Sequence, residues 1–381
     1  MKLKNKIILL VLLVILLGVL LVALDSPYMH AMMGDTSQLE SMTIINDNRS
    51  NLSIVVTGDV MFGRNTPGVL SFDESPYRYV SNVTSDSDIL LVNTENPFTT
   101  SSNAMKGDVP LKANPEYIPL INGTKGTVIS ANANNHLFDY GVEGMRDSIK
   151  NLDSNGIIHI GAGENKQEAS KPAVIEKNGY KITIFNYMDS DNFQEYSQEV
   201  MPIATDDSPG YSAWDDETSP GQIRQAKENG SDFVLVYMHY GNEYSRSPNQ
   251  MQIDISHKAI DAGADAVVGA HAHVTQGVEM YKDKPIYYNL GNFIFDQSRS
   301  DTHVAYIVGF KLDKRNVTAT LYPVYISGYL PQLMDSSGAN SLLDELNPQC
   351  DSMQRSDEGW GVIHYSLDNE TTSKFSLLHS K

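Results

Sequence analysis

Polar side chains suited to metal binding recur where apolar runs of the sequence end. Asp59 closes one such run, Asn93 and Glu95 end a second, and Asn135 and His136 follow a third. Carboxylate and carboxamide oxygens bind hard cations or zinc, and an imidazole beside them can donate a proton. Each motif alone could be a turn or a buried, hydrogen-bonded polar group. Together they predict a metal site with a proton donor.

Histidines extend this pattern in the second half of the chain. His239 ends an apolar run, and His271 and His273 follow another, two positions apart, so both imidazoles can face one pair of metal ions. Cys350 is the only cysteine, which excludes an intramolecular disulfide and a thiolate metal cluster, although a bond to another chain stays open. We expect the other histidines to be structural or exposed: His30, His159, His257, His303, His364 and His379.

These polar residues need strands to position them, and short β-branched runs alternate with helical patterns from Asn51 onward. The expected strands are Leu52–Thr57, Ile89–Asn93, Thr127–Ala131, Ile157–Ile160, Lys181–Asn186, Phe233–His239, Ala266–Gly269 and Pro285–Asn289. The expected helices are Val142–Asn155, Pro220–Asn229 and Gln250–Ala262, followed by a hairpin of Val304–Leu312 and Val317–Val324. The alternation predicts an α/β fold, in which strand ends carry the ligand site.

The two ends of the chain differ in residue composition from the region between them. Lys2, Lys4 and Lys6 precede an apolar run over 7–24 that is near the length of a membrane span, which predicts an uncleaved signal anchor. By the positive-inside rule the rest of the chain lies outside the cell, at the membrane or secreted if the segment is cleaved. Residues 25–50 read as a polar linker, 51–330 as the main domain, and 331–381 as an extension that could pack on it, with a strand at Trp360–Tyr365.

Charge narrows the range of partners. The chain has 47 acidic and 28 basic residues and a formal net charge of -19, which repels nucleic-acid phosphates and anionic lipids. A hydrophobic share of 41% is typical of a folded domain. Asn-x-Ser/Thr sequons suit a surface glycoprotein and occur at Asn48, Asn51, Asn82, Asn122, Asn229, Asn316 and Asn369.

The order of these motifs resembles the CapA family of capsule (poly-γ-glutamate) synthesis proteins, a branch of the calcineurin-like metallophosphoesterases. The resemblance rests on Gly58-Asp59-Val60-Met61-Phe62-Gly63-Arg64, Asn93-x-Glu95, Asn134-Asn135-His136, His239-Tyr240-Gly241-Asn242-Glu243-Tyr244, His271-x-His273 and Asn289-Leu290-Gly291-Asn292-Phe293-Ile294-Phe295-Asp296. It spans about Leu52 to Gln297.

The resemblance implies a four-layer α-β-β-α sandwich with one or two divalent ions, Mn, Zn, Fe or Mg, at one edge. It implies that Asp59 and His273 hold one metal, that Asn135, His239 and His271 hold the other, and that Glu95 bridges them. His136 would protonate the leaving oxygen, while a metal-bound hydroxide attacks the substrate. Around this site we expect substrate-binding residues at Arg64, Asn93, Glu243, Tyr244, Gln276 and Asn292, and also at Asn249 and Gln250.

Two positions depart from the superfamily pattern: Glu95 stands where the superfamily bridges its metals with the shorter aspartate, and Met61 replaces a histidine. The first motif of the superfamily is Asp-x-His, and Met61 occupies its third position here. A thioether is a poor ligand for hard cations, so the first metal has one ligand fewer, and a site with a single metal stays open.

Three functions follow from this reading. The first is a metal-dependent hydrolase of the cell surface that cleaves a phosphoester or an amide of an envelope polymer or its precursor. The second is a non-catalytic component that binds the polymer and works with membrane synthase or export subunits. The third, a secreted nucleotidase, is disfavoured because the first-motif histidine is absent. A locally positive cleft around Arg64 and the metals would be needed to attract polyglutamate to so acidic a chain.

Overall fold

The computed structural model describes residues 49–107, 109–193, 197–347 and 350–367. The chain divides into two units, Met1–Asn48 and Arg49–Lys381, of which the second contains all of the described residues. The predicted anchor over 1–24, most of the predicted linker and the chain beyond 367 lie outside them. Within the described segments, no helix has the length and apolar character that a membrane span requires.

The first sheet is mixed, and the strands of one half of it are parallel. Among the described residues it has ten strands, with a main path of β17-β18-β15-β14-β1-β2-β3-β4, while β13 pairs with β1 and β16 with β15. Their bounds are β1 Leu52–Val60, β2 Ile89–Thr94, β3 Thr127–Ala131, β4 Ile158–Ile160, β13 Asn292–Ile294, β14 Val304–Asp313, β15 Asn316–Ser327, β16 Leu330–Leu333, β17 Gln354–Arg355 and β18 Gly361–Ser366. Strands β1 to β4 run parallel, so their carboxyl ends meet at one edge.

The second sheet has the order β11-β12-β10-β9-β7-β6. Its strands are β6 Ala173–Lys177, β7 Tyr180–Met188, β9 Phe233–His239, β10 Ala266–Ala270, β11 Thr275–Tyr281 and β12 Lys284–Leu290. Strands β7, β9, β10 and β12 are parallel to one another. A small separate pair joins β5 Ala162–Gly163 to β8 Gly210–Tyr211.

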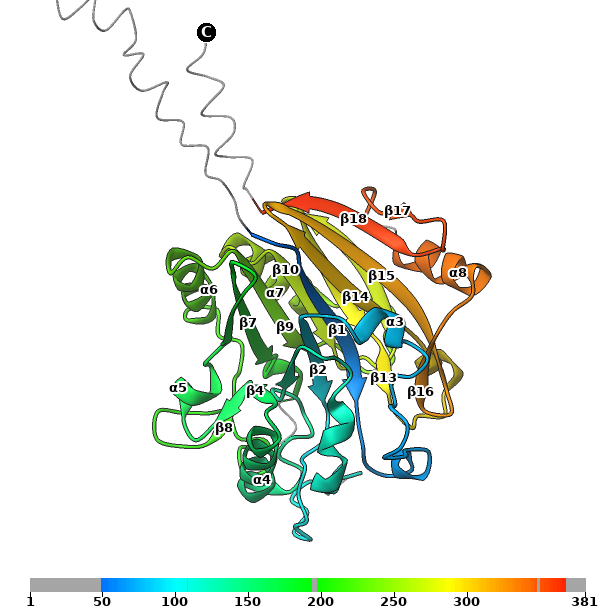
Figure 1. Ribbon diagram of the computed structural model, residues 1–381. Coiled ribbons are helices and arrows are strands. Elements are labelled where there is room, and N and C mark those ends of the chain that lie inside the picture. The colour runs from blue at the N-terminus through cyan, green and yellow to red at the C-terminus, as the bar shows by residue number, and fades with distance from the viewer. Residues whose placement is uncertain (1–48, 108, 194–196, 348–349, 368–381) are drawn as a thin grey trace, which may run out of the picture. The chain divides into compact units, whose positions relative to one another are not determined.

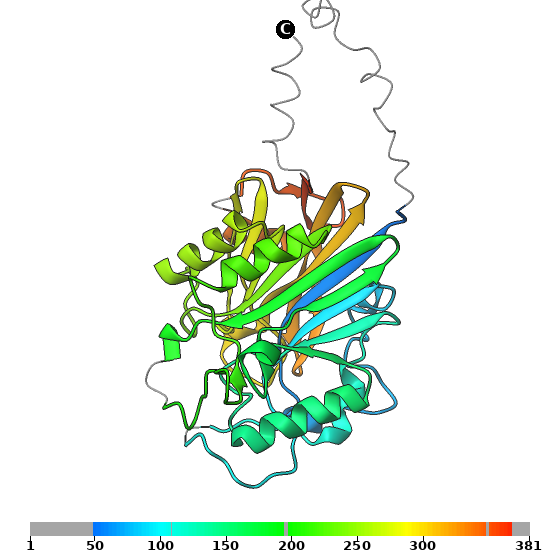
Figure 2. The same cartoon turned by 90° about the vertical axis from the view of Figure 1, so that its left-hand side faces the viewer.

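The two sheets pack face to face, and helices cover their outer sides. One buried cluster joins Ile54 and Leu91 of the first sheet to Leu235 and Val268 of the second. The helical elements are η1 Thr66–Gly68, α3 Ser81–Thr84, η2 Pro115–Ile121, α4 Gly141–Ser154, α5 Lys166–Ala169, η3 Asp191–Phe193, α6 Ser219–Glu228, α7 Gln250–Asp261, η4 Ser300–His303 and α8 Ser336–Leu346. Helices α6 and α7 pack side by side on the outer face of the second sheet, and η2 and α4 pack on the first (Figures 1 and 2). This is the expected α-β-β-α sandwich.

The strands and helices predicted from periodicity are confirmed within three residues at each end. Strands β5, β6, β8, β11, β13, β16 and β17 and helices α3, α5 and α8 were not predicted. Most of these strands are very short, β6 lies at an edge, and β11 alternates only weakly between buried and half-buried positions.

The C-terminal part of the described chain completes the sandwich. Strand β18 pairs with β15, close to the strand predicted at Trp360–Tyr365. Helix α8 contacts β15 and β11, and its Leu343 is buried in the core between the sheets. Cys350 lies in the same core and is fully buried. A disulfide between Cys350 and another chain would therefore require this core to open.

Candidate metal centre

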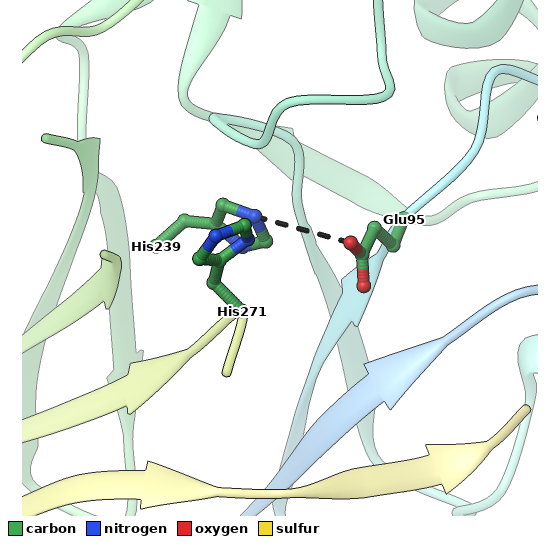
Figure 3. A group of neighbouring side chains, drawn as sticks. All are labelled: Glu95, His239 and His271. Atoms are coloured by element: carbon green, nitrogen blue, oxygen red, sulfur yellow. Dashed lines mark ion pairs between the residues drawn. The ribbon is translucent and has the colours of Figure 1, made fainter. Parts of the chain in front are cut away.

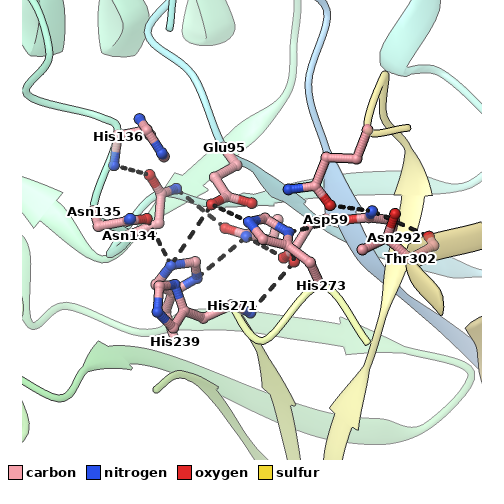
Figure 4. Close-up of polar contacts among 12 residues, drawn as sticks. Asp59, Glu95, Asn134, Asn135, His136, His239, His271, His273, Asn292 and Thr302 are labelled. Carbon is pink, nitrogen blue, oxygen red and sulfur yellow. Dashed lines mark hydrogen bonds and ion pairs between the residues drawn. The ribbon is translucent and has the colours of Figure 1, made fainter. Parts of the chain in front are cut away.

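Strand ends from both sheets meet at one edge of the sandwich, and they place the predicted metal ligands there. Asp59 lies near the end of β1, and Glu95 directly follows β2. His239 ends β9, and His271 directly follows β10. All of these side chains are buried, and Figure 4 shows them gathered at this edge. Parallel strands produce this convergence because their carboxyl ends lie at the same edge.

One group of ligand atoms joins Asp59, Glu95 and His273. The Nδ1 atom of His273 lies 3.2 Å from an Asp59 oxygen, and its Nε2 lies 3.8 Å from a Glu95 oxygen. One candidate ligand atom from each residue lies within 4.8 Å of the others. Two carboxylates and an imidazole are a donor set that suits zinc, manganese or iron.

A second group joins Glu95, His239 and His271, again within 4.8 Å (Figure 3). The Nε2 atom of His239 lies 4.0 Å from Glu95 and 2.9 Å from the carboxamide oxygen of Asn135. Glu95 belongs to both groups, so it is the residue that would bridge two ions if both sites were filled. The structure thus brings together all six residues predicted as metal ligands.

Buried atoms without partners test whether a cation fits this cluster. Among the described residues, both carboxylate oxygens of Glu95 and the Nδ1 atom of His271 are buried and have no hydrogen-bond partner. Buried polar groups in proteins are almost always hydrogen-bonded, because an unsatisfied one costs about 1 to 3 kcal/mol. A divalent ion would satisfy these atoms, so the donor set fits a metal.

The protonation of the cluster follows from its burial. Burial lowers the pKa of His239 and His271 well below the usual range, so both imidazoles are neutral near pH 7 and can donate a lone pair. Burial, together with the Asp59 carboxylate, raises the pKa of Glu95. Burial acts to lower the pKa of His273 too, but the Glu95 and Asp59 carboxylates outweigh it and raise this pKa to about 9.

Three residues predicted to bind substrate instead hold other parts of the site. Asn93 donates a hydrogen bond to Asp59 (2.8 Å), and the Asn292 carboxamide oxygen lies 2.9 Å from Nδ1 of His273. Gln276 donates to the Ser245 carbonyl (2.9 Å) and so ties down the loop after β9. All three are buried, and none is among the described residues that line the cavity above the cluster.

That cavity has a volume of about 450 Å³ and opens over the ligand cluster. Its described lining residues are Arg64, Lys106, Val109, Leu111, Asn135, His136, Phe193, Asn242, Glu243, Tyr244, His271, His273, Phe295 and Gln297. Arg64, Glu243 and Tyr244 were predicted as substrate-binding residues and do line it. Asn249 caps the first turn of α7, and the exposed Gln250 begins that helix, so neither lines the cavity in the described chain.

His136 lines the cavity and is held by a carboxylate that the sequence reading missed. Its Nδ1 lies 2.6 Å from an Asp139 oxygen, which leaves Nε2 for other contacts. Burial lowers the pKa of His136, and Asp139 opposes this by stabilising the protonated ring. The spacing of three residues between His136 and Asp139, in the turns between β3 and α4, was the available signal.

Two motifs of the site have unusual backbone requirements. A Cβ atom at Gly58 would lie 1.8 Å from the carbonyl oxygen of Gly291, so glycine is required before Asp59. His271 and His273 have positive φ angles of 97° and 58°. Non-glycine residues are strained there, and such strain persists where the surrounding structure enforces it, often at functional sites.

Met61 does not join the ligand cluster. It packs in a small apolar group with Leu111 and Phe295, and its sulfur lies 2.9 Å from the backbone nitrogen of Gly63. The group of Asp59, Glu95 and His273 therefore has no fourth ligand at this position, whereas Asn135 supplements the other group.

The fold is the four-layer sandwich of the metallophosphoesterase type that the resemblance implies, and a buried cluster of imidazoles, carboxylates and a carboxamide lies at its strand ends. Residues 53–297 match the model of the family described as "Bacterial capsule synthesis protein PGA_cap", and the chain belongs to that family.

Two curated relatives carry capsule names. The chain is 30% identical to a "PGA biosynthesis protein CapA" of Bacillus subtilis over 85% of its own length and 84% of the relative's. It is 32% identical to a "Capsule biosynthesis protein CapA" of Bacillus anthracis over 71% and 66% of the two lengths. Among solved structures, it is similar to the NAD nucleotidase NadN of Haemophilus influenzae, with 13% identity, a TM-score of 0.41, and coverage of 87% of this chain and 67% of that one.

Proposed function

We propose that this protein is a metal-dependent hydrolase that cleaves a bond in an envelope polymer of the poly-γ-glutamate type or in its precursor. The observation that carries the proposal is the pair of buried ligand groups that share Glu95, together with buried ligand atoms that have no hydrogen-bond partner in the described chain. The capsule names of the relatives support the polymer as the substrate class.

The position of each residue assigns it a role in the proposed reaction. Asp59, Glu95 and His273 would hold one divalent ion, and Asn135, His239 and His271 would hold a second one against the same Glu95. Bound ions would acidify a water molecule and stabilise negative charge that develops on the substrate. Nε2 of His136 would donate a proton to the leaving group while Asp139 holds its other nitrogen; because burial outweighs Asp139 and lowers the pKa of His136, the protonated ring is the minor form near pH 7.

A second function is favoured by one observation. Met61 packs in an apolar cluster where a further ligand would complete the Asp59 group. A chain that binds one metal firmly and the other weakly could recognise the polymer without cleaving it. In that case the protein would act as a binding component beside membrane synthase or export subunits.

The experiment that tests the proposal measures metal content by mass spectrometry and hydrolysis of two probes, p-nitrophenyl phosphate and a γ-glutamyl peptide. It compares wild type, His271→Ala and the control His364→Ala, which changes an exposed histidine on β18. We expect one or two metals per chain and turnover in wild type and the control. Metal content and turnover should both fall in His271→Ala.

Each other outcome has a definite meaning. Metal without turnover of either probe would favour the binding component, and absence of metal from wild type would rule out the proposed centre.

A further inference from the structure

A second cationic residue, Lys106, lines the cavity and was not among the predicted site residues. Among the described lining residues, Arg64 and Lys106 carry fixed positive charge, and Glu243 is acidic. Arg64 forms an ion pair with Asp296, whose other oxygen accepts a hydrogen bond from the backbone of Asn65 (2.9 Å). The charge of Arg64 is therefore matched at short range by a buried carboxylate, as is that of Lys106, which forms an ion pair with Asp139 (3.9 Å).

Lys106 lines the same cavity although its side chain is only 4% exposed. Lysine is rarely buried to this degree, because its ammonium group loses hydration. Its Nζ donates to the backbone carbonyl of Asn135 at 3.3 Å, next to the carboxamide that faces His239. This contact places the ammonium beside the predicted metal ligands and beside His136.

The loop that carries Lys106 is built on Asp139. The backbone of Met105 donates to the Asp139 carbonyl (2.8 Å), and the backbone of Leu111 donates to its Oδ2 (2.6 Å). The same Oδ2 contacts His136, while Oδ1 has no hydrogen-bond partner among the described residues and lies 3.9 Å from Nζ of Lys106. One buried carboxylate thus orients both His136 and the loop that presents Lys106.

We propose that Lys106 binds an anionic oxygen of the substrate, a carboxylate or phosphate oxygen, in the part of the cavity beside His136. Lys106 is then a specificity-determining residue, and the substrate class is an anion. An ammonium has three N–H donors and acts as a point charge, and its attraction for an anion is stronger where water is largely excluded. The inference rests on the proposed function, since it concerns the substrate of the same site.

The test measures binding of two probes, inorganic phosphate and tri-γ-glutamate, by isothermal titration calorimetry on the purified full chain loaded with Mn²⁺. The variants are Lys106→Gln, Lys106→Arg and the control Lys112→Gln. Lys112 lies on the same loop and donates to the Ser101 carbonyl (2.5 Å), but it is not among the described residues that line the cavity. The control therefore makes the same charge change outside the proposed site.

We expect Kd for at least one probe to rise about tenfold in Lys106→Gln, the effect of one lost charged contact. Lys112→Gln should bind like wild type, and Lys106→Arg should keep most of the affinity because it keeps the charge. The probe that shows the effect identifies the oxyanion as carboxylate or phosphate. Thermal unfolding of each variant checks its fold, and Lys106→Arg keeps the test decisive if Lys106→Gln is unstable.

The inference is overturned if Lys106→Gln binds both probes like wild type, if Lys112→Gln loses as much affinity, or if wild type binds neither probe at millimolar concentration. Metal content, measured on the same samples, reports on the proposed function separately. Its absence would contradict the metal centre, whereas an unchanged metal content with unchanged anion affinity would contradict only the role of Lys106.

Discussion

At the scale of single residues, the site depends on burial as much as on residue type. Glu95, His239 and His271 are common side chains, and they become a candidate metal centre because the fold removes their water and gives them few other partners. Asn93 and Asn292 were predicted to contact the substrate. In the structure their side chains form hydrogen bonds with the predicted metal ligands Asp59 and His273.

The raised pKa of His273 predicts how metal affinity depends on pH. A ring with a pKa of about 9 in the metal-free protein is protonated at pH 7, and a metal must displace that proton. Affinity for Mn²⁺ should therefore rise between pH 7 and 9, by up to about tenfold per unit, and level off above. His239 and His271 add no slope there, since their pKa values are low, whereas Glu95, whose pKa burial and Asp59 raise, adds to the rise wherever it still holds a proton. Titrations that show no change across this range would contradict the prediction.

The close contact at Gly58 predicts that a larger residue at this position destabilises the fold without changing its charge. In Gly58→Ala, the new methyl group would lie 1.8 Å from the Gly291 carbonyl oxygen, so β1 and β13 must separate. We expect the free energy of unfolding to fall by about 1 to 3 kcal/mol and metal affinity to weaken, because Asp59 moves with β1. The control Gly68→Ala places its methyl in open space and should have no effect on denaturant unfolding.

At the scale of elements, strands position the predicted metal ligands, and loops supply much of the lining of the cavity above them. Parallel strands from two different sheets supply Asp59, His239 and the residues after β10, so the centre depends on how the sheets pack. The loop between β2 and η2 supplies Lys106, and its position depends on Asp139 rather than on any strand.

Helix α8 predicts a stabilising role for the C-terminal region. Leu343 is fully buried between the sheets, and Leu343→Ala should lower the free energy of unfolding by about 2 to 4 kcal/mol through lost burial and a cavity. Ser341→Ala, at an exposed position of the same helix, is the control. Metal content should stay unchanged in both variants. Equal midpoints in urea would show that α8 does not support the core.

At the scale of the whole molecule, a net charge of -19 opposes an anionic substrate at long range. Salt screens this repulsion, so the association rate with poly-γ-glutamate should rise by about two- to fivefold between 20 and 200 mM salt. Stopped-flow measurements check this, with an uncharged polymer as control. A rate that falls with salt would mean that local positive charge at the cavity dominates the encounter.

The anchor over residues 1–24 and the outward-facing orientation stay predictions, since these residues lie outside the described chain. The full chain should sediment with membranes, and a chain that starts at Arg49 should not. Protease added to intact cells should degrade the domain if it faces outward. Full protection from the protease would contradict the orientation.

The sequence by itself determined most of the longer strands, the α/β class, the helices with clear periodicity and the residue types of the ligand cluster. These features are local: an apolar run that ends in Asp59, or a His271-x-His273 pair, can be read without knowledge of distant residues. Their shared position at strand ends already placed them at one edge of a sheet.

Only the tertiary structure decided which polar residues face the cavity and which support it. Gln276 and Lys106 are both buried polar residues in the chain, and only packing puts Lys106 in the cavity and Gln276 behind it. The placement of α8 and β18 against β15 likewise depends on contacts between distant segments. Such contacts join segments far apart in the chain, so periodicity within a short window carries no information about them.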